Sequence, residues 1–544
     1  MVGEFPLLVE TRPPGLIGRY FVTQKHVLGL IFGGIRSWAR SREKPYPRFH
    51  GLAGVIGRLA SPFLAPELRD LPFPVQLRRR LEILGPTYIK LGQVLSLRED
   101  LFPTAITDEL KNLLDRLPAV PLDRVKEIVE ADLGRPVVVM FSWIDPNPLG
   151  SASIGQVHRA RTVDGDDVVL KIVKPGNREI LKRDTILLNL LGRFLQTFLE
   201  RFQPRRVLRE FTDYTQRELD LRREADNAET FAANFRDTPD VVFPKIYREY
   251  SGRDVLTMEF LDGIKPTSAE AQSLTDDQRD KLLDLGALAI IRMLYKDGFF
   301  HADLHPGNLL VLPGARVGFI DLGMVGRFNE ELKRTLMWYY FCLVTGDSEN
   351  AARYLAMVAD AGRKGDAHGF RREVEETSRR WAKTSNFKEY PLARLILQSV
   401  AQGARFDMYF PVETVLMVKA LVTFEGVGQI LKPGFDVKQV SQRHVNDIFI
   451  AQFSPLKLAK EGIRGTPELL EALVKAPMLI TEGLKLLEAT QKRPAENPLA
   501  GLRTTLLAGA CMIAAAILVA FKAPWYSWVP LFAGSLLLAL WRKR

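Results

Sequence analysis

Apolar residues follow three kinds of pattern along the chain. Residues 168–170 form a short run of β-branched and aliphatic side chains that ends at Lys171, which predicts a strand. Residues 282–295 place apolar side chains at helical spacing. Residues 504–521 and 523–541 are long, mostly apolar runs without a charged residue. The pattern predicts a small β-rich region, a larger helical region and a separate apolar tail.

The two tail runs have flanks typical of membrane helices. Each is close to the roughly 20 residues that a helix needs to cross a bilayer. Arg503 precedes the first run, aromatic residues cluster at 525–528, and basic residues occupy 542–544. Basic flanks favour the cytoplasmic side, so we expect a transmembrane hairpin in the inner membrane, with the catalytic body and both tail ends cytoplasmic. A buried helical hairpin is the alternative. The N-terminus lacks the pattern of a signal peptide.

Composition and charge agree with a large globular protein of a reducing compartment that contacts a membrane. The 544 residues are 47% hydrophobic and 26% charged, with a net charge of +11. Two cysteines, Cys342 and Cys511, cannot build a disulfide framework or a cysteine-rich zinc site. The first fifty residues contain eight Lys or Arg against three Glu, which favours contact with an anionic lipid leaflet. We find no nucleic-acid-binding signature and expect no nucleic-acid partner.

Candidate chemistry is concentrated in the segment His301-Ala302-Asp303-Leu304-His305-Pro306-Gly307-Asn308. Its spacing is that of the kinase pattern H-R-D-x-x-x-x-N, and Asp321-Leu322-Gly323 stands where D-F-G would follow. Carboxylate and amide oxygens suit Mg²⁺, so Asn308 and Asp321 are the expected metal ligands and Asp303 the catalytic base. Taken singly, each of these residues is more often a helix cap or turn former. A histidine metal site in this loop is not expected.

The upstream sequence supplies the other parts of a kinase site. Lys171 resembles the lysine of V-A-I-K, which contacts nucleotide phosphates. The segment 150–157 matches a glycine-rich phosphate loop, except that Ala152 replaces the second glycine, which restricts the backbone. A helical stretch contains Glu218 and Glu224, candidates for the glutamate partner of Lys171, or else members of a solvated helix face. The expected nucleotide-binding residues are Gly150, Ser151, Ala152, Ser153, Gly155, Val157 and Lys171, and Lys171 and Glu224 join Asp303 as catalytic residues.

Lys90 and Gln93 form a further candidate element. Three residues apart, they share a face of a helix, and Gly92 between them permits close approach to a neighbouring element. We expect them to reach the carboxylates of Glu218 and Asp220 and to close the pocket that a protein substrate would occupy, which would make all four regulatory. An ordinary surface Lys and Gln is the alternative.

These ordered motifs resemble those of the UbiB (AarF/ADCK) family of protein-kinase-like proteins, over roughly residues 80–435. The resemblance implies a Lys-x-Gly-Gln extension over the active site, an alanine-rich loop and a Glu-x-Asp motif at 218–220. It implies an atypical ATPase that uses ATP (or ADP) and Mg²⁺ and acts poorly on proteins in trans. It also implies a role in ubiquinone biosynthesis at a membrane, with quinone intermediates or biosynthetic enzymes as partners. Gly150, Ser151 and Leu114 depart from the family motifs, so any inhibitory effect of the alanine-rich loop rests mainly on Ala152.

The expected fold class is α+β, a bilobal protein-kinase-like fold with a helical Lys-x-Gly-Gln extension and a C-terminal transmembrane hairpin. The alternatives to an ATPase are a protein or small-lipid kinase acting in trans and a nucleotide-binding scaffold for a biosynthetic complex. The expected regions are a basic leader (1–80), the helical extension (81–135), the kinase-like N-lobe with inserted helices (136–263), the helical C-lobe (264–440), amphipathic connecting helices (441–502) and two transmembrane helices (503–541).

Overall fold

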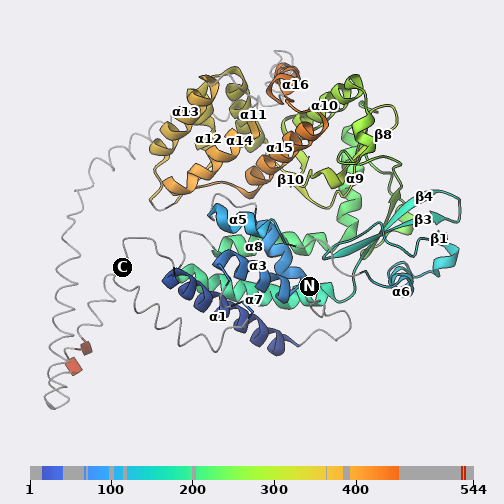
Figure 1. Ribbon diagram of the computed structural model, residues 1–544, viewed down its shortest axis with the longest axis horizontal. Coiled ribbons are helices and arrows are strands. Elements are labelled where there is room, and N and C mark those ends of the chain that lie inside the picture. The colour runs from blue at the N-terminus through green and yellow to red at the C-terminus, as the bar shows by residue number, and fades with distance from the viewer. Residues whose placement is uncertain are drawn as a thin grey trace, which may run out of the picture. The chain divides into compact units, whose positions relative to one another are not determined.

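The computed structural model describes residues 15–40, 67–68, 71–96, 103–113, 119–198, 204–362, 364–383, 392–435, 437–452, 529–530 and 532–533. The chain divides into two compact units, Met1–Ile450 and Ala451–Arg544. The strands among the described residues lie in the first unit (Figure 1), as do residues 150–171 and 301–323. The predicted tail runs lie outside the described residues except at 529–530 and 532–533, so the transmembrane hairpin stays a prediction.

A five-stranded antiparallel sheet forms the first lobe, with the order β1-β3-β4-β6 and β2 paired to β3. The predicted strand at 168–171 is confirmed as part of β4. Strand alternation buries Val168, Leu170 and Ile172 completely and turns Lys171 to the opposite face. The strands are β1 (Phe141–Ile144), β2 (Gly150–Ser151), β3 (Gly155–Thr162), β4 (Asp167–Val173) and β6 (Val255–Glu259).

Helix α6 (Leu122–Leu133) covers the apolar face of this sheet with Val125 and Val129, both fully buried. The segment before α6 is attached through Gln156 of β3. Its Oε1 accepts a hydrogen bond from Val120 N at 2.7 Å, and its Nε2 donates to Val120 O at 2.9 Å. The fully buried side chain of Gln156 therefore joins this segment to the sheet. The next residue, Val157, pairs directly with Lys171 across strands β3 and β4.

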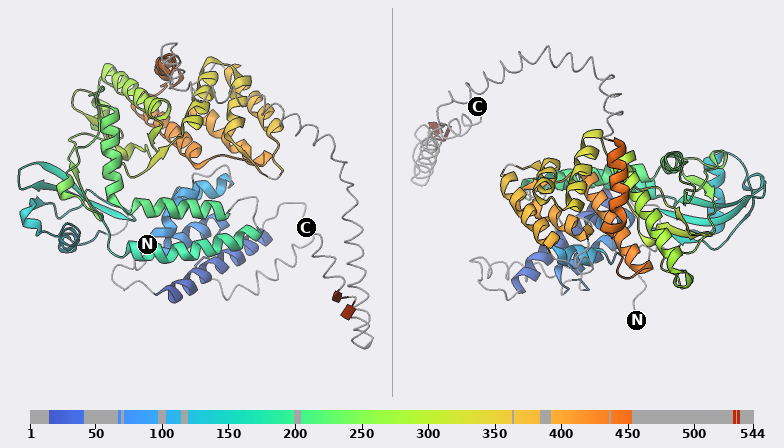
Figure 2. Two further views of the ribbon diagram at one scale, coloured as in Figure 1. Left: turned by 180° about the vertical axis from the view of Figure 1, so that it is seen from behind. Right: turned by 90° about the horizontal axis from the view of Figure 1, so that it is seen from above.

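Helices from the N-terminal segment pack against helices inserted after β4 (Figure 2). A buried ion pair between Arg19 Nε and Asp184 Oδ1, at 2.7 Å, joins the two groups. Within the N-terminal group, Gly92 lets α4 lie close to its neighbours, because a Cβ atom there would lie 2.3 Å from Leu113 Cδ1 and 2.8 Å from Leu81 Cδ1. The N-terminal helices are α1 (Leu16–Arg40), α3 (Phe73–Leu84), α4 (Pro86–Ser96) and α5 (Thr104–Leu110); the inserted ones are α7 (Asn177–Phe198), α8 (Pro204–Glu218) and α9 (Leu221–Asn234).

The second lobe is mainly helical and is built from the residues after β6 together with residues 241–242. The predicted helix at 282–295 is confirmed as α10 (Asp276–Ile291) and the wider turn η6 (Arg292–Asp297) that continues it. Two antiparallel strands, β7 (Phe299–His301) and β10 (Val325–Arg327), flank the segment of the kinase-like motif at 301–308, called the catalytic loop below, and the segment around Asp321. A second small sheet has the order β5-β9-β8, built from β5 (Val241–Val242), β8 (Leu309–Leu312) and β9 (Arg316–Phe319).

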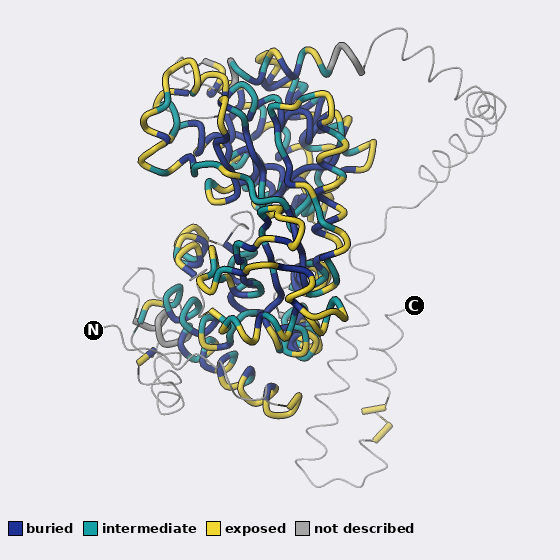
Figure 3. Tube along the Cα trace, turned by 90° about the vertical axis from the view of Figure 1, so that its right-hand side faces the viewer, coloured by how far each residue is buried: buried dark blue, intermediate teal, exposed yellow. Residues whose placement is uncertain are grey.

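The remaining helices of the second lobe form a packed layer beside these strands. Buried positions run through the interior of both lobes (Figure 3). Among the described residues, α15 is long and apolar enough to span a membrane, but 56% of its most apolar window is buried inside the protein. The helices are α11 (Glu330–Thr345), α12 (Ser348–Val358), α13 (Ala367–Lys383), α14 (Leu392–Gln402), α15 (Val412–Leu431) and α16 (Val437–Gln452), with strands β11 (Asp360–Ala361) and β12 (Met408–Tyr409) and short turns η2 (Val137–Val139), η4 (Arg248–Tyr250), η5 (Glu270–Ser273), η7 (Pro306–Asn308) and η8 (Gly403–Phe406).

Candidate active site

Lys171 lies at the centre of a cluster of charged side chains. Its Nζ donates to both carboxylate oxygens of Glu224 at 2.8 Å and to Asp321 Oδ1 at 2.9 Å. These residues come from β4, from α9 and from the loop after β9, so three separate elements meet here. Of the two glutamates that the sequence left open as partners of Lys171, the structure selects Glu224.

The pKa values of the three side chains in this cluster are shifted in different directions. Burial raises the pKa of Glu224 to about 7, although Lys171 opposes the shift. Burial works against the charge of Asp321, but the ammonium of Lys171 outweighs it and holds the pKa of Asp321 well below its ordinary value. The pKa of Lys171 lies above its ordinary value, since the carboxylates of Asp321 and Glu224 outweigh the effect of burial. Glu224 is thus the member of the cluster that titrates near neutral pH.

The backbone at Asp321 adopts an unusual conformation. Its φ is 56°, in the left-handed region that non-glycine residues seldom occupy. The next residue is held by α9, because Asn227 Nδ2 donates to Leu322 O at 3.0 Å. Asn227 lies one turn after Glu224 on the same helix. Helix α9 therefore positions Lys171 through Glu224 and the Asp321 segment through Asn227.

The catalytic loop is braced by His301 and Asn308. His301 is fully buried, and its Nδ1 accepts a hydrogen bond from Asp303 N at 3.1 Å, so Nε2 carries the proton that faces Ile320 O at 3.4 Å. Burial lowers the pKa of His301, which keeps the ring neutral. Asn308 Nδ2 donates to Asp303 O at 3.0 Å, which leaves the amide oxygen of Asn308 as the atom suited to a metal.

Asp303 is paired with a lysine that the sequence motifs did not indicate. Lys419 Nζ of α15 lies 2.6 Å from Asp303 Oδ1. Burial of Asp303 is outweighed by Lys419, so the pKa of Asp303 is lowered and its carboxylate stays ionised. The sequence does mark Lys419 in one respect, because it is the single charged residue in the apolar run 414–424. What that charge contacts, 116 residues from Asp303, could not be inferred from spacing.

The predicted phosphate loop is a tight hairpin between β2 and β3. Gly150 pairs with Val157 and Ser151 with Gln156, and Ala152 N donates to Gly155 O at 2.9 Å. None of Gly150, Ala152, Ser153 or Gly155 has a positive φ. The conformational freedom of glycine is therefore not used at these positions.

Two side chains at the start of the inserted helices attach the tip of this hairpin. Lys174 Nζ donates to Ala152 O at 2.7 Å, and Asn177 Nδ2 donates to Ser153 O and Ile154 O, each at 3.1 Å. Burial lowers the pKa of Lys174 to about 8. Neither Lys174 nor Asn177 belongs to a motif that the sequence indicated. Hydrogen bonds to backbone carbonyl groups therefore fix the tip of the loop, and the side chain of Ala152 restricts its backbone as well.

The Lys-x-Gly-Gln segment lies on α4 and reaches the inserted helices. Lys90 Nζ donates to Glu218 Oε1 at 2.7 Å, while Glu218 Oε2 is buried without a hydrogen-bond partner among the described residues. Glu218 outweighs the effect of burial and raises the pKa of Lys90, with smaller contributions from Asp303 and Asp321. Half-buried Gln93 lies one turn further along α4.

Asp220 has a role other than the expected one. It is the N-cap of α9, accepting a hydrogen bond from Arg222 N at 3.3 Å, and its carboxylate pairs with the Arg222 guanidinium at 2.7 and 2.9 Å. A carboxylate at this position satisfies free backbone donors of the first helical turn. Of the two carboxylates expected to meet Lys90, Glu218 does so and Asp220 begins the helix that carries Glu224.

The residues present suit a magnesium nucleotide. Asp321 supplies an ionised carboxylate, Asn308 an amide oxygen, and Lys171 a cation next to both carboxylates of the cluster. Among the described residues, no three His, Cys, Asp or Glu side chains form a metal-binding group. Mg²⁺ usually completes its octahedral shell with water and phosphate oxygens, so two protein ligands are enough.

Comparison with known proteins assigns the chain to a family. Residues 112–355 match the ABC1 atypical kinase-like domain, and residues 383–436 match the UbiB helical domain. The chain is 31% identical over 467 residues to the "Probable protein kinase UbiB" of Cellvibrio japonicus, covering 81% of this chain and 84% of that protein. The chain belongs to the UbiB family. The resemblance predicted from the motifs is confirmed.

Two further relatives extend well beyond the region that they share with this UbiB-family chain. An uncharacterized protein of Synechocystis sp. is 33% identical over 375 residues, covering 67% of this chain and 63% of that protein. The chloroplastic protein ACTIVITY OF BC1 COMPLEX KINASE 7 of Arabidopsis thaliana is 32% identical over 377 residues, covering 68% and 54% respectively. The chain thus spans less than two thirds of both.

Family membership also explains the architecture of the site. The kinase-like fold predicted from the motifs is confirmed, with mixed helices and strands. The UbiB helical domain contains α14 and α15, so Lys419 comes from outside the kinase-like domain and contacts its catalytic loop. In this UbiB-family protein, both domains contribute side chains to one cluster.

The pKa of Glu224 leads to a testable dependence of stability on pH. Its rise from 4.5 to about 7 means that, between these values, the folded protein retains a proton that the unfolded chain releases. Stability from this group therefore falls as pH rises through that window. Glu224→Gln cannot ionise, so we expect its melting temperature, relative to wild type, to increase steadily from pH 4.5 to 7.

The matched control is Glu229→Gln on the same helix. Arg248 lowers the pKa of Glu229, so its titration lies below pH 4.5 and its variant should show no trend across the window. Parallel melting curves for the two variants would contradict the raised pKa of Glu224.

Proposed function

We propose that this protein is a membrane-anchored, atypical kinase-like ATPase that supports ubiquinone biosynthesis. The observation that carries the proposal is the contact of Lys171 with both Glu224 and Asp321, beside a catalytic loop in which Asn308 fixes Asp303. A nucleotide-binding scaffold without catalytic activity would not need all of these groups in mutually supported positions. Family membership supports the quinone setting, and the apolar runs at 504–521 and 523–541 support the anchor.

Each residue of the site would have a distinct task. Lys171 would hold the phosphates, with Glu224 fixing its ammonium in place. Asn308 and Asp321 would hold Mg²⁺, and bound Mg-ATP would supply the transferable phosphoryl group together with the positive charge of the metal. Asp303, ionised beside Lys419, would orient the attacking water and accept its proton at a carboxylate oxygen. The hairpin at 150–157 would cover the phosphates.

Hydrolysis is favoured over phosphorylation of a protein in trans because of the Lys-x-Gly-Gln helix. Lys90 of α4 is tied to Glu218 at 2.7 Å, and the charges of Asp303 and Asp321 act on the same ammonium. We infer that this helix would hinder the approach of a large acceptor. A protein or small-lipid kinase acting in trans remains the alternative, and labelled phosphate on a discrete acceptor would identify it.

The test is ATP hydrolysis by the purified full chain with and without vesicles that contain anionic lipid. We expect lipid-stimulated hydrolysis by wild type. Ubiquinone content of a deletion strain complemented with wild type or with Asp321→Asn connects this activity to the pathway, and only wild type should restore it. Nucleotide binding without hydrolysis under either condition would contradict an ATPase, and unchanged ubiquinone in the deletion strain would contradict the pathway.

Removal of Lys90 tests the closing role of α4. In Lys90→Ala, the ion pair with Glu218 is lost; the two side chains are 15% and 21% exposed, so the loss should exceed the roughly 1 kcal/mol of a solvent-exposed pair. We expect autophosphorylation to rise at least about fivefold as the extension opens more often. Lys111→Ala removes an exposed ion pair in the same extension and is the control. Unchanged nucleotide affinity, hydrolysis and autophosphorylation in Lys90→Ala would exclude the closing role.

A further inference from the structure

The cations around the catalytic loop are not equally engaged. Lys171 uses all three of its N–H groups on carboxylate oxygens, two from Glu224 and one from Asp321. Lys90 is tied to Glu218. Lys419 Nζ has Asp303 as its hydrogen-bond partner among the described residues, and its side chain is 21% exposed. Two of its N–H groups are therefore available to a ligand at the loop.

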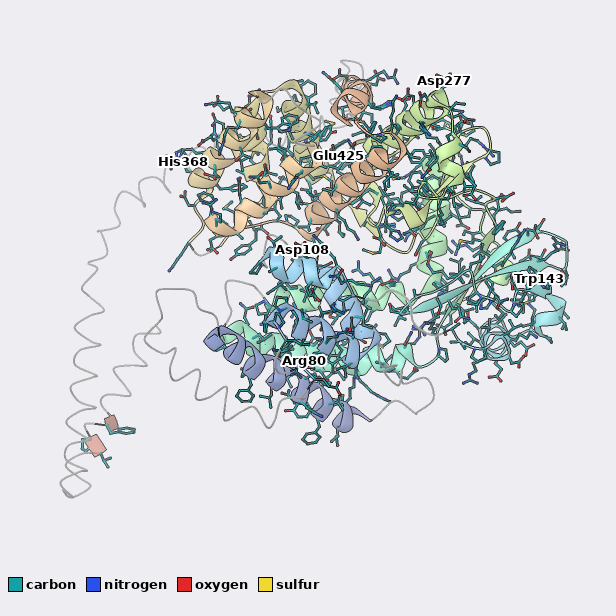
Figure 4. All side chains as sticks on the ribbon, in the orientation of Figure 1. Arg80, Asp108, Trp143, Asp277, His368 and Glu425 are labelled. Carbon is teal, nitrogen blue, oxygen red and sulfur yellow. The ribbon has the colours of Figure 1, made fainter. Side chains whose placement is uncertain are left out.

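Lys419 is fixed in place by the packing of α15. Glu425 of this helix, labelled in Figure 4, is buried and accepts a hydrogen bond from Ala393 N of α14 at 3.1 Å. Phe424 packs on α10, where a Cβ atom in place of the Gly286 hydrogen would lie 2.7 Å from its ring. Residues Met417, Val418 and Ala420 beside the lysine are buried. The helix therefore presents one cation, on a rigid support, to the catalytic loop.

The carboxylate of Asp303 places a negative charge at the catalytic loop. Residues 301–308 contain no Lys or Arg; His305 Nε2 lies 3.7 Å from Asp303 Oδ2, and Lys265 Nζ donates to the carbonyl oxygen of Gly307. The terminal phosphate of a nucleoside triphosphate would lie close to Asp303, and two like charges at short range repel each other strongly. An ammonium that contacts Asp303 and still has two donors can bind the phosphate and cancel this repulsion.

We propose that Lys419 is a binding residue for the terminal phosphate of the nucleotide, so that the UbiB helical domain forms part of the active site. The proposal rests on the proposed nucleotide-binding function and adds a specific subsite to it. A lysine that only positions Asp303 would affect ATP and ADP alike. A lysine that binds the terminal phosphate distinguishes them, because ADP lacks that group.

The experiment compares the affinities of Mg-ATP and Mg-ADP for wild type and Lys419→Met by calorimetric titration, which needs no turnover. We expect Lys419→Met to weaken ATP binding at least about tenfold more than ADP binding, the effect of losing a charged hydrogen bond. Lys419→Arg keeps the charge and should recover most of the loss. Lys432→Met removes an exposed lysine just after the same helix, paired with Asp280, and should change neither affinity.

Two further variants make the result decisive. Asp303→Asn removes the carboxylate but keeps Lys419. Its affinity for ATP relative to ADP should be at least as high as that of wild type. The double variant Lys419→Met with Asp303→Asn leaves neither charge of the pair without its partner, so it controls for misfolding of the single variant. Its affinity for ATP should still fall more than its affinity for ADP. An equal effect on ATP and ADP in the Lys419 variants overturns the proposal. Absence of nucleotide binding by wild type would instead overturn the proposed function.

Discussion

Asp321→Asn is expected to reduce ATP hydrolysis by at least about 100-fold, the scale of losing a fixed charge-stabilising group in an active site. Asparagine has nearly the same shape as aspartate and tolerates the left-handed backbone, so the φ of 56° can be kept. The substitution removes the negative charge that would hold Mg²⁺ and the charge that faces Lys171 at 2.9 Å. Hydrolysis and nucleotide binding in the presence and absence of Mg²⁺ measure the effect.

A second aspartate provides a matched control for the backbone. Asp407 also has a left-handed conformation, with φ at 55°, and lies in the turn that follows η8, away from the Lys171 cluster. Asp407→Asn should retain ATP hydrolysis. Near-normal hydrolysis by Asp321→Asn would remove Asp321 from the metal site, whereas equal losses in both variants would assign the effect to the backbone conformation.

Lys171→Met is expected to abolish nucleotide binding and also to destabilise the protein. The side chain of Glu224 is only 6% exposed, and Lys171 is the cation that contacts it. Breaking a buried ion pair by removing one partner typically costs about 3–5 kcal/mol, because the other charge remains buried without compensation. The melting temperature at pH 8 should fall clearly, and lower pH should restore part of it as Glu224 takes up a proton.

The double variant Lys171→Met with Glu224→Gln separates stability from function. It removes both buried charges, so the melting temperature at pH 8 should return towards that of wild type. Nucleotide binding should not return, because the phosphates have lost their cation. A double variant as unstable as Lys171→Met would show that packing around Lys171, and not the unpaired charge of Glu224, determines stability at this position.

The comparison of Glu218 with Glu224 illustrates how far local spacing can be interpreted. Both residues stood in a predicted helical stretch, and either could have met Lys171. In the structure the helix breaks at 219–220, Asp220 caps α9, and the new helix direction carries Glu224 to Lys171 while Glu218 faces Lys90. The break is a local feature, but its consequence depends on where α4 and β4 lie.

The sequence by itself determined the elements whose information is local. Strand β4 and the helix that leads to the catalytic loop follow from patterns within short segments, and the structure confirms both. The choice of Asp303, Asn308 and Asp321 as candidate site residues also rests on spacing within short segments. The family followed from the order of such segments. Periodicity and motif spacing carry this information because they depend on backbone geometry, which neighbouring residues decide.

Only the tertiary structure decided which distant groups meet. The attachment of the phosphate loop by Lys174 and Asn177, the pairing of Lys90 with Glu218, and the contact of Lys419 with Asp303 join segments that no spacing relates. An isolated lysine in an apolar helix shows that a charge must be satisfied, but its partner depends on how whole helices pack. The packing of α15 against α10 and α14 is what brings a cation from the helical domain to the catalytic loop, because a buried charge is stable only where folding places a partner within reach.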